Sequence, residues 1–171
     1  SLKHIKEGHQ VQLRILEANR KKKKLRLTLK PVLVNAELSE LLFSYDKATV
    51  GKGYQGYISE AREKGYVVKF FGNTTGFLSF TDIEVTHKMV RTDFLTGQTV
   101  KVYVSRVDPE NRKLMLSLSQ ANALSSKNDS THHKMIPALN ETDPKELIKL
   151  NKVFQYKVLP NKSKKLDDLI V

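Results

Sequence analysis

One stretch of the sequence occurs twice, and this repeat constrains the fold more than any other feature. Residues 5–30 align with residues 94–119 without a gap, at a constant offset of 89 positions. A repeat at a fixed spacing is typical of structural units that recur along one chain, so we expect the same local fold twice. The matched residues include Gly8 with Gly97, Val11 with Val100, and Leu25, Leu27 and Leu29 with Leu114, Leu116 and Leu118.

Each copy of the repeat predicts a β-hairpin. In the first copy, apolar residues occupy every second position at Val11, Leu13 and Ile15 and again from Leu25 to Leu29. This period of two is typical of strands with one buried face. A polar turn separates the two runs, at residues 19–24 in the first copy and at residues 108–112 in the second.

Residues 47–120 contain enough strand patterns for a complete small barrel. Three further strands are expected before the second hairpin, at residues 54–59, 65–71 and 77–80. Glycines fall where the strands of such a barrel bend. A five-stranded barrel of this size is an OB fold. The expected fold class is therefore mainly β, a five-stranded OB-fold barrel with short helical linkers.

The remaining residues predict parts of neighbouring repeats and the linkers between them. Residues 1–30 are expected to be the last two strands of a preceding barrel, and residues 31–46 a linker with a short helix within residues 36–43. Residues 121–146, rich in Ser, Asn, Thr and His, predict a flexible linker, and residues 147–171 the start of a following repeat. Half a barrel has unpaired strand edges, so we expect the first hairpin to need a partner.

The chain is strongly basic, which favours a polyanionic partner. It has 30 Lys and Arg residues against 18 Asp and Glu, a formal net charge of +12. Nucleic acid is the first candidate, and a basic domain without such a partner is the alternative. The charge is uneven: residues 1–30 carry ten bases and two acids, or +8, whereas residues 47–120 carry eleven and seven, or +4.

Other classes of function lack the residues they need. The chain has no cysteine, which excludes disulfides and thiolate metal sites. No apolar run approaches the roughly 18 residues of a membrane span. No Ser/His/Asp set, carboxylate pair or zinc-ligand spacing is evident. We therefore expect a protein that is not an enzyme, needs no cofactor or metal, and has neither a membrane nor a small-molecule substrate as partner.

Pieces of one sequence pattern run through all five expected strands of the barrel. They are Val50-Gly51, Gly56-Tyr57-Ile58, Gly65-Tyr66-Val67-Val68, the segment Gly76–Thr81, Gly97–Val102 and Leu114–Leu118. This pattern resembles the ribosomal-protein-S1-type RNA-binding domain, a family of OB folds, and the resemblance implies RNA binding. OB folds bind oligonucleotides on the face of their second and third strands, beside the loops after the first and fourth strands.

The junction before the barrel resembles that of the tandem repeats in nucleolar multi-repeat ribosomal-RNA processing proteins. The similar residues are Leu27–Pro31 with Leu33 and Val34, followed in the barrel by Lys69–Asn73. This resemblance implies contact with precursor ribosomal RNA during small-subunit assembly, in the nucleus and nucleolus, beside other ribosome-assembly proteins. The alternative is a scaffold repeat that docks such proteins and has little contact with RNA.

The barrel departs from the family pattern where RNA-binding members carry two aromatics and a histidine. Those positions are Lys64, Val67 and Ser79 here. We therefore expect weak binding, mainly through phosphates. Several aromatic rings could pack in the core or at its rim instead of contacting a base. They are Tyr66, Phe70, Phe71, Phe77 and Phe80. The candidate RNA-binding residues of the barrel are Tyr57, Lys64, Tyr66, Lys69, Ser79, Arg106, Asp108, Arg112 and Lys113, with Tyr57 and Tyr66 as possible base stackers and Asp108 with Arg112 or Lys113 as the acid-and-base pair that the family carries.

A second candidate site is a run of five cations in the turn of the first hairpin. Such a cluster suits phosphates or an acidic partner, and its composition also fits a nuclear-import signal. A solvated turn without a partner is the alternative. We expect electrostatic attraction of RNA to concentrate at this turn, which consists of Arg20, Lys21, Lys22, Lys23 and Lys24.

Overall fold

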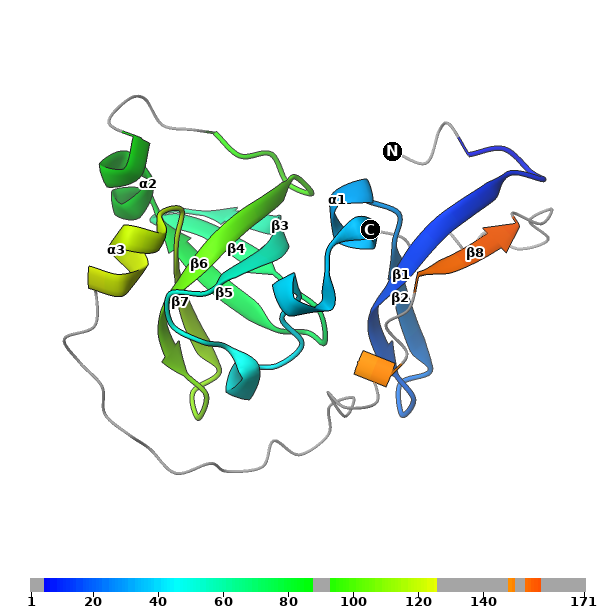
Figure 1. The fold of residues 1–171 in the computed structure, drawn as a ribbon, viewed down its shortest axis with the longest axis horizontal. Coiled ribbons are helices and arrows are strands. Elements are labelled where there is room, and N and C mark those ends of the chain that lie inside the picture. Colours follow the sequence, from blue (N-terminus) through cyan, green and yellow to red (C-terminus); the bar gives the residue numbers. More distant parts are fainter. Residues whose placement is uncertain (1–4, 88–92, 126–147, 150–152, 158–171) are drawn as a thin grey trace.

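The structure is a computed structural model that describes residues 5–87, 93–125, 148–149 and 153–157 (Figure 1). An N-terminal hairpin precedes a five-stranded barrel, and a short strand follows near the C-terminus. The strands are β1 (Gln10–Asn19), β2 (Lys24–Thr28), β3 (Gly53–Arg62), β4 (Gly65–Lys69), β5 (Thr75–Ser79), β6 (Thr99–Asp108), β7 (Lys113–Ser117) and β8 (Phe154–Lys157). The helices are α1 (Pro31–Asn35), α2 (Phe80–His87) and α3 (Gln120–Ser125), with 3₁₀ turns η2 (Leu38–Glu40) and η3 (Tyr45–Lys47).

Strands β3 to β7 form a closed barrel, as the sequence predicted. Their order around the barrel is β3-β4-β5-β7-β6, and all neighbours are antiparallel except β5 and β7. The alternate residues that point inward build the core, because successive side chains of a strand point to opposite faces. The largest fully buried side chains of this core are Tyr54, Ile58, Leu78, Leu114, Val68, Val102 and Val104.

The two copies of the repeat have the same backbone geometry. Lys23 and Arg112, which correspond at the offset of 89, both adopt a positive φ, 48° and 53°. The amide of Lys22 donates to Asn19 Oδ1 over 2.9 Å, as the amide of Asn111 donates to Asp108 Oδ1 over 3.1 Å. A register shift interrupts both hairpins at corresponding positions. The N-terminal hairpin therefore has the same backbone geometry as strands β6 and β7 of the barrel.

The linkers differ from the prediction in two places. Helix α1 lies over residues 31–35 rather than 36–43, because Pro31 presets the φ angle of a first helical turn. Residues 121–125, predicted as flexible linker, belong to helix α3, whose Ala123 is fully buried. Residues 126–146 and 158–171, which carry the rest of the predicted linker and most of the predicted following repeat, lie outside the described residues. No helix in the described ranges is long and apolar enough to cross a membrane.

The N-terminal hairpin packs directly against the barrel. A second hydrophobic cluster joins β1, α1 and the linker to two rings of the barrel, Tyr57 and Phe71. The amide of Gly72 donates to the carbonyl of Leu16 over 2.9 Å, and the amide of Phe71 donates to the carbonyl of Leu42 over 3.0 Å. The hairpin and the barrel are thus joined by a shared apolar cluster and by backbone hydrogen bonds.

Candidate nucleic-acid interface

A row of five residues crosses the outer face of the barrel. The strand register places Glu60 opposite Val67, Val67 opposite Phe77, Phe77 opposite Met115, and Met115 opposite Arg106. Residues paired in this way have their side chains on the same face of a sheet. Val67 and Phe77 are half-buried, and Met115 is 39% exposed. We call Val67, Phe77 and Met115 the apolar strip.

The ring of Phe77 extends over Gly65 of β4, which lies diagonal to Phe77, beside its registered partner Val67. A Cβ atom built on Gly65 would lie 2.8 Å from Phe77 Cζ and would also collide with the carbonyl of Leu78. The tip of the ring therefore occupies the space that a side chain at position 65 would take. The ring lies on the second and third strands of the OB barrel, which form the nucleic-acid-binding face of that fold.

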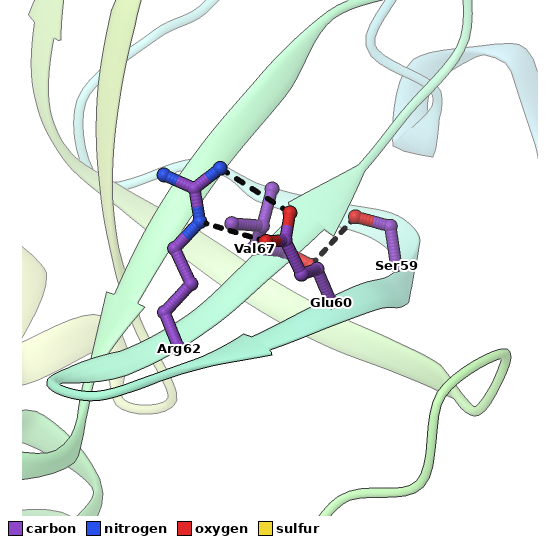
Figure 2. A network of polar contacts seen from close by, with 4 residues as sticks. All are labelled: Ser59, Glu60, Arg62 and Val67. Carbon is purple, nitrogen blue, oxygen red and sulfur yellow. Dashed lines mark hydrogen bonds and ion pairs between the residues drawn. The ribbon is translucent and has the colours of Figure 1, made fainter.

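Polar residues of β3 border the strip on one side (Figure 2). The hydroxyl of Ser59 donates to the carbonyl of Val67 over 3.1 Å. Arg62 donates from Nε and Nη2 to the carboxylate of Glu60, over 3.3 and 3.2 Å. Both charged side chains are exposed, so this ion pair adds little stability and its guanidinium is available to a competing phosphate. Glu60 and Arg62 were not among the residues predicted from the sequence, since neither belongs to a recognisable motif.

Four of the predicted cations lie near the apolar strip. Arg106 is part of the row, and Lys113 lies two residues before Met115 on β7. Lys64 is exposed in the turn between β3 and β4, and Lys69 lies two residues beyond Val67 on β4. The strip is thus edged by positive charge from several strands, which is the combination of cations and an aromatic ring that single-strand binders use.

Three other predicted residues have structural partners instead. Asp108 accepts hydrogen bonds from the side chain and the amide of Asn111, which lower its pKa and close the β6–β7 turn. The guanidinium of Arg112 lies 5.6 Å from the centre of the Tyr45 ring. The hydroxyl of Ser79 accepts from the amide of Asp82 at the start of α2. Asp108 also lies opposite Lys113 across the hairpin, and the charges of Lys113 and Arg106 help to lower its pKa.

The two tyrosines predicted as base stackers are buried, so the structure contradicts this prediction. Tyr57 is 4% exposed beneath the hairpin, and its hydroxyl accepts from Arg26 Nη2 over 3.2 Å. Burial raises the pKa of Tyr57. Tyr66 is 5% exposed and packs edge-on against Phe80 and Phe94, with centroids 5.3 and 5.4 Å away. A buried ring has no free face for a base. Tyr66 therefore packs in the core of the barrel, which was the alternative interpretation of the sequence.

The basic turn of the first hairpin is exposed as predicted. Residues 20–24 all lie at the surface, and the turn corresponds to residues 109–113 at the end of β6 and the start of β7. In an OB fold this is the loop after the fourth strand, one of the two that flank the binding face. Figure 1 shows the β1–β2 turn and the β6–β7 turn at the same end of the molecule.

We expect Tyr57→Phe to lower the free energy of unfolding by about 1 kcal/mol. The hydroxyl contact with Arg26 would be lost, and a net hydrogen bond is worth about that much. Arg26 would keep its ion pair with Glu17, at 3.6 Å, which limits the cost. Urea unfolding measures the change. Tyr103→Phe on β6 is the matched control, and an equal loss in both variants would contradict a specific contribution from the Arg26 contact.

Comparison with known proteins identifies the barrel. Residues 47–119 match the S1 RNA binding domain family. This part of the chain is an S1 domain. The matched residues span all five strands of the closed barrel, which confirms the resemblance inferred from the sequence.

The chain also shows distant similarity to RRP5 proteins. It is 34% identical over 113 residues to "rRNA biogenesis protein rrp5" of Schizosaccharomyces pombe, covering 66% of this chain and 7% of that protein. It is 28% identical over 160 residues to "Protein RRP5 homolog" of Homo sapiens, covering 90% of this chain and 8% of that protein. The chain therefore spans less than a tenth of the length of these relatives.

Among solved structures, the S1 barrel is similar to GSP13 from Bacillus subtilis. The sequence identity is 25% and the TM-score 0.38, over 52% of this chain and 66% of GSP13.

Proposed function

We propose that this chain binds single-stranded segments of precursor ribosomal RNA during ribosome biogenesis in the nucleolus. The observation that carries the proposal is the apolar strip, with Phe77 at its centre and cations at its edges, on the OB face that binds oligonucleotides. The S1 domain supports RNA as the ligand. The similarity to rRNA biogenesis proteins supports ribosomal RNA as its source.

The binding mechanism combines one stacking position with many phosphate contacts. Phe77 offers a ring on which one base stacks. Val67 and Met115 lie on either side of Phe77 and provide apolar contacts. Arg106, Lys113 and the basic turn hold the phosphates. Contacts of this kind position an RNA strand without reading its sequence, because bases carry specificity through their edges and phosphates do not. Affinity then grows as repeats on one chain bind the same RNA. The chain takes part in RNA processing as a binding module and not as a catalyst.

A second candidate function is the docking of a ribosome-assembly protein on the same face. The observation that favours it is that the strip is apolar. The face also lacks the three ring side chains of the family, at Lys64, Val67 and Ser79. A protein partner would bind with little dependence on salt, whereas an RNA partner would dissociate steeply as salt rises. An RNA titration therefore separates the two functions.

The test of the proposal is the variant Phe77→Ala. We expect it to weaken binding to a short single-stranded RNA about 5- to 150-fold, because a stacked base is worth roughly 1–3 kcal/mol. The salt dependence of binding should stay the same, since no phosphate contact is removed. Fluorescence anisotropy of labelled RNA at several salt concentrations measures both quantities.

Phe77→Tyr is the matched control for Phe77→Ala. It keeps an aromatic ring over Gly65 and should keep most of the affinity. Circular dichroism establishes that both variants fold. Unchanged affinity of a folded Phe77→Ala variant would argue against stacking on the strip, and no RNA binding by the unaltered chain even at low salt would favour the protein-docking function.

A further inference from the structure

Strand β8 pairs with the outer edge of β1. The two strands are antiparallel, and the registered pairs are Gln10–Lys157, Val11–Tyr156, Gln12–Gln155 and Leu13–Phe154. This pairing gives a three-stranded sheet in the order β2-β1-β8. It joins segments that lie more than a hundred residues apart in the sequence (Figure 1).

The same register occurs inside the complete S1 barrel. Strand β1 corresponds to β6 at an offset of 89, and β6 pairs with β3, the first strand of the barrel. Strand β8 corresponds to β3 at an offset of 100. With these two offsets, each registered pair between β1 and β8 matches a registered pair between β6 and β3. The corresponding pairs are Gln10–Lys157 with Thr99–Tyr57, Val11–Tyr156 with Val100–Gly56, Gln12–Gln155 with Lys101–Gln55, and Leu13–Phe154 with Val102–Tyr54.

We propose that β8 is a first strand of the S1 type and that it occupies the first-strand position beside a hairpin from another repeat. The order β2-β1-β8 repeats the order β7-β6-β3 of the complete barrel. The residues agree as well: Gln155 corresponds to Gln55, and Phe154 corresponds to the inward-pointing Tyr54. The edge of β1 is thus an interaction surface for first strands of S1 repeats, and β8 is its occupant in this chain.

The pairing of β8 with β1 has a physical reason. An unpaired edge of β1 would leave a row of backbone N–H and C=O groups open to any extended chain. Strand β3 pairs in this register with β6, the copy of β1, so a strand that resembles β3 matches the edge of β1. A following repeat on the same chain supplies that strand at high effective concentration.

The composite sheet stays open where the complete barrel closes. Tyr156 occupies the position that corresponds to Gly56, and a Cβ atom on Gly56 would lie 2.7 Å from Val68 Cγ1 and 2.9 Å from the carbonyl oxygen of Lys69. Glycine lets β4 approach β3 there, and a tyrosine in its place would not fit. Among the described residues the composite sheet has three strands and leaves Phe154 39% exposed, whereas Tyr54 is 2% exposed in the closed barrel.

A pair of engineered cysteines tests the proposal in the full chain. Because the chain has no cysteine, Gln12→Cys with Gln155→Cys introduces the only two thiols. Both side chains are exposed and lie on paired positions. Directly opposed residues of antiparallel strands have Cα atoms about 4.5–5.5 Å apart, within the range that a disulfide spans. We expect mild oxidation to give an intramolecular disulfide, detected by mass spectrometry of the digested monomer.

The control pair is Gln10→Cys with Gln155→Cys, which is shifted by two residues. Diagonal positions lie roughly 7–8 Å apart, so this pair should form the disulfide much more slowly. Equal rates for the two pairs, or no disulfide at the registered pair, would overturn the proposed register. A disulfide that joins two chains would overturn the assignment of β8 of the same chain as the occupant. The readout involves no RNA and is independent of the proposed function.

Discussion

Replacing Lys21, Lys22 and Lys24 with glutamine is expected to weaken binding to single-stranded RNA on the order of 100-fold at roughly 0.1 M salt. Each phosphate neutralised on a single strand contributes about −0.7 to the slope of log affinity against log salt, so three lost contacts reduce the slope by about 2. Lys23 stays unchanged because its backbone, with φ of 48°, belongs to the turn. Anisotropy titrations at several salt concentrations measure the affinity and the slope.

The matched control removes the same charge from another part of the surface. Lys6, Lys47 and Lys52 are exposed and lie outside the hairpin turn, so their joint replacement by glutamine also lowers the net charge by three. We expect this variant to lose much less affinity, through the weaker overall field alone. Equal losses in the two triple variants would show that net charge, and not the basic turn, attracts the RNA.

Replacing Phe71 with alanine is expected to lower the free energy of unfolding by about 3–5 kcal/mol, the usual cost of removing a buried phenylalanine ring. Phe71 is fully buried between the hairpin and the barrel, and its ring centroid lies 5.4 Å from that of Phe43. Urea unfolding measures the loss. Hydrogen exchange at the amide of Gly72, which is bonded to the carbonyl of Leu16, should accelerate as the hairpin separates from the barrel.

A nearby exposed residue provides the control for Phe71→Ala. Leu38 lies in the linker between the hairpin and the barrel, and more than half of its side chain is exposed. Leu38→Ala should therefore change the free energy of unfolding by less than about 0.5 kcal/mol. If Phe71→Ala destabilised the chain while exchange at Gly72 stayed slow, the ring would support the barrel alone and not the contact with the hairpin.

The docked hairpin has a consequence for RNA binding. The apolar strip lies on the barrel and the basic turn on the N-terminal hairpin, and a shared apolar cluster connects the two. Under the proposed function, this contact would let one RNA strand bind both areas without the entropic cost of ordering a flexible joint. The Phe71→Ala variant should therefore also lose part of the combined affinity, although it removes no side chain of either contact area.

Local patterns explain what could be predicted. The alternation at Val11, Leu13 and Ile15 and its copy on β6 depend only on the period of two, so both hairpins and the five-stranded barrel were correct. The exposure of residues 20–24 also follows from the sequence, because a run of lysines between two strands has no apolar surface to bury. Both features follow from neighbouring residues along the chain.

The side chains that face the outside of the barrel could not be assigned in this way. Tyr57 points outward from β3 and would be exposed in an isolated barrel, but the preceding hairpin covers it. Phe77 is one aromatic among several in the sequence, and only the pairing of β5 with β4 and β7 places it over Gly65 at the centre of the strip. The position of β8 depends likewise on an edge more than a hundred residues away.

The strands, the repeat and the location of the positive charge follow from the amino-acid sequence alone, because period, turn residues and charge are properties of consecutive positions. Which outward-facing rings are buried depends on tertiary packing. The burial of such a side chain is set by what packs over it, and here the N-terminal hairpin covers Tyr57, whereas Phe77 stays half-buried on the outer face.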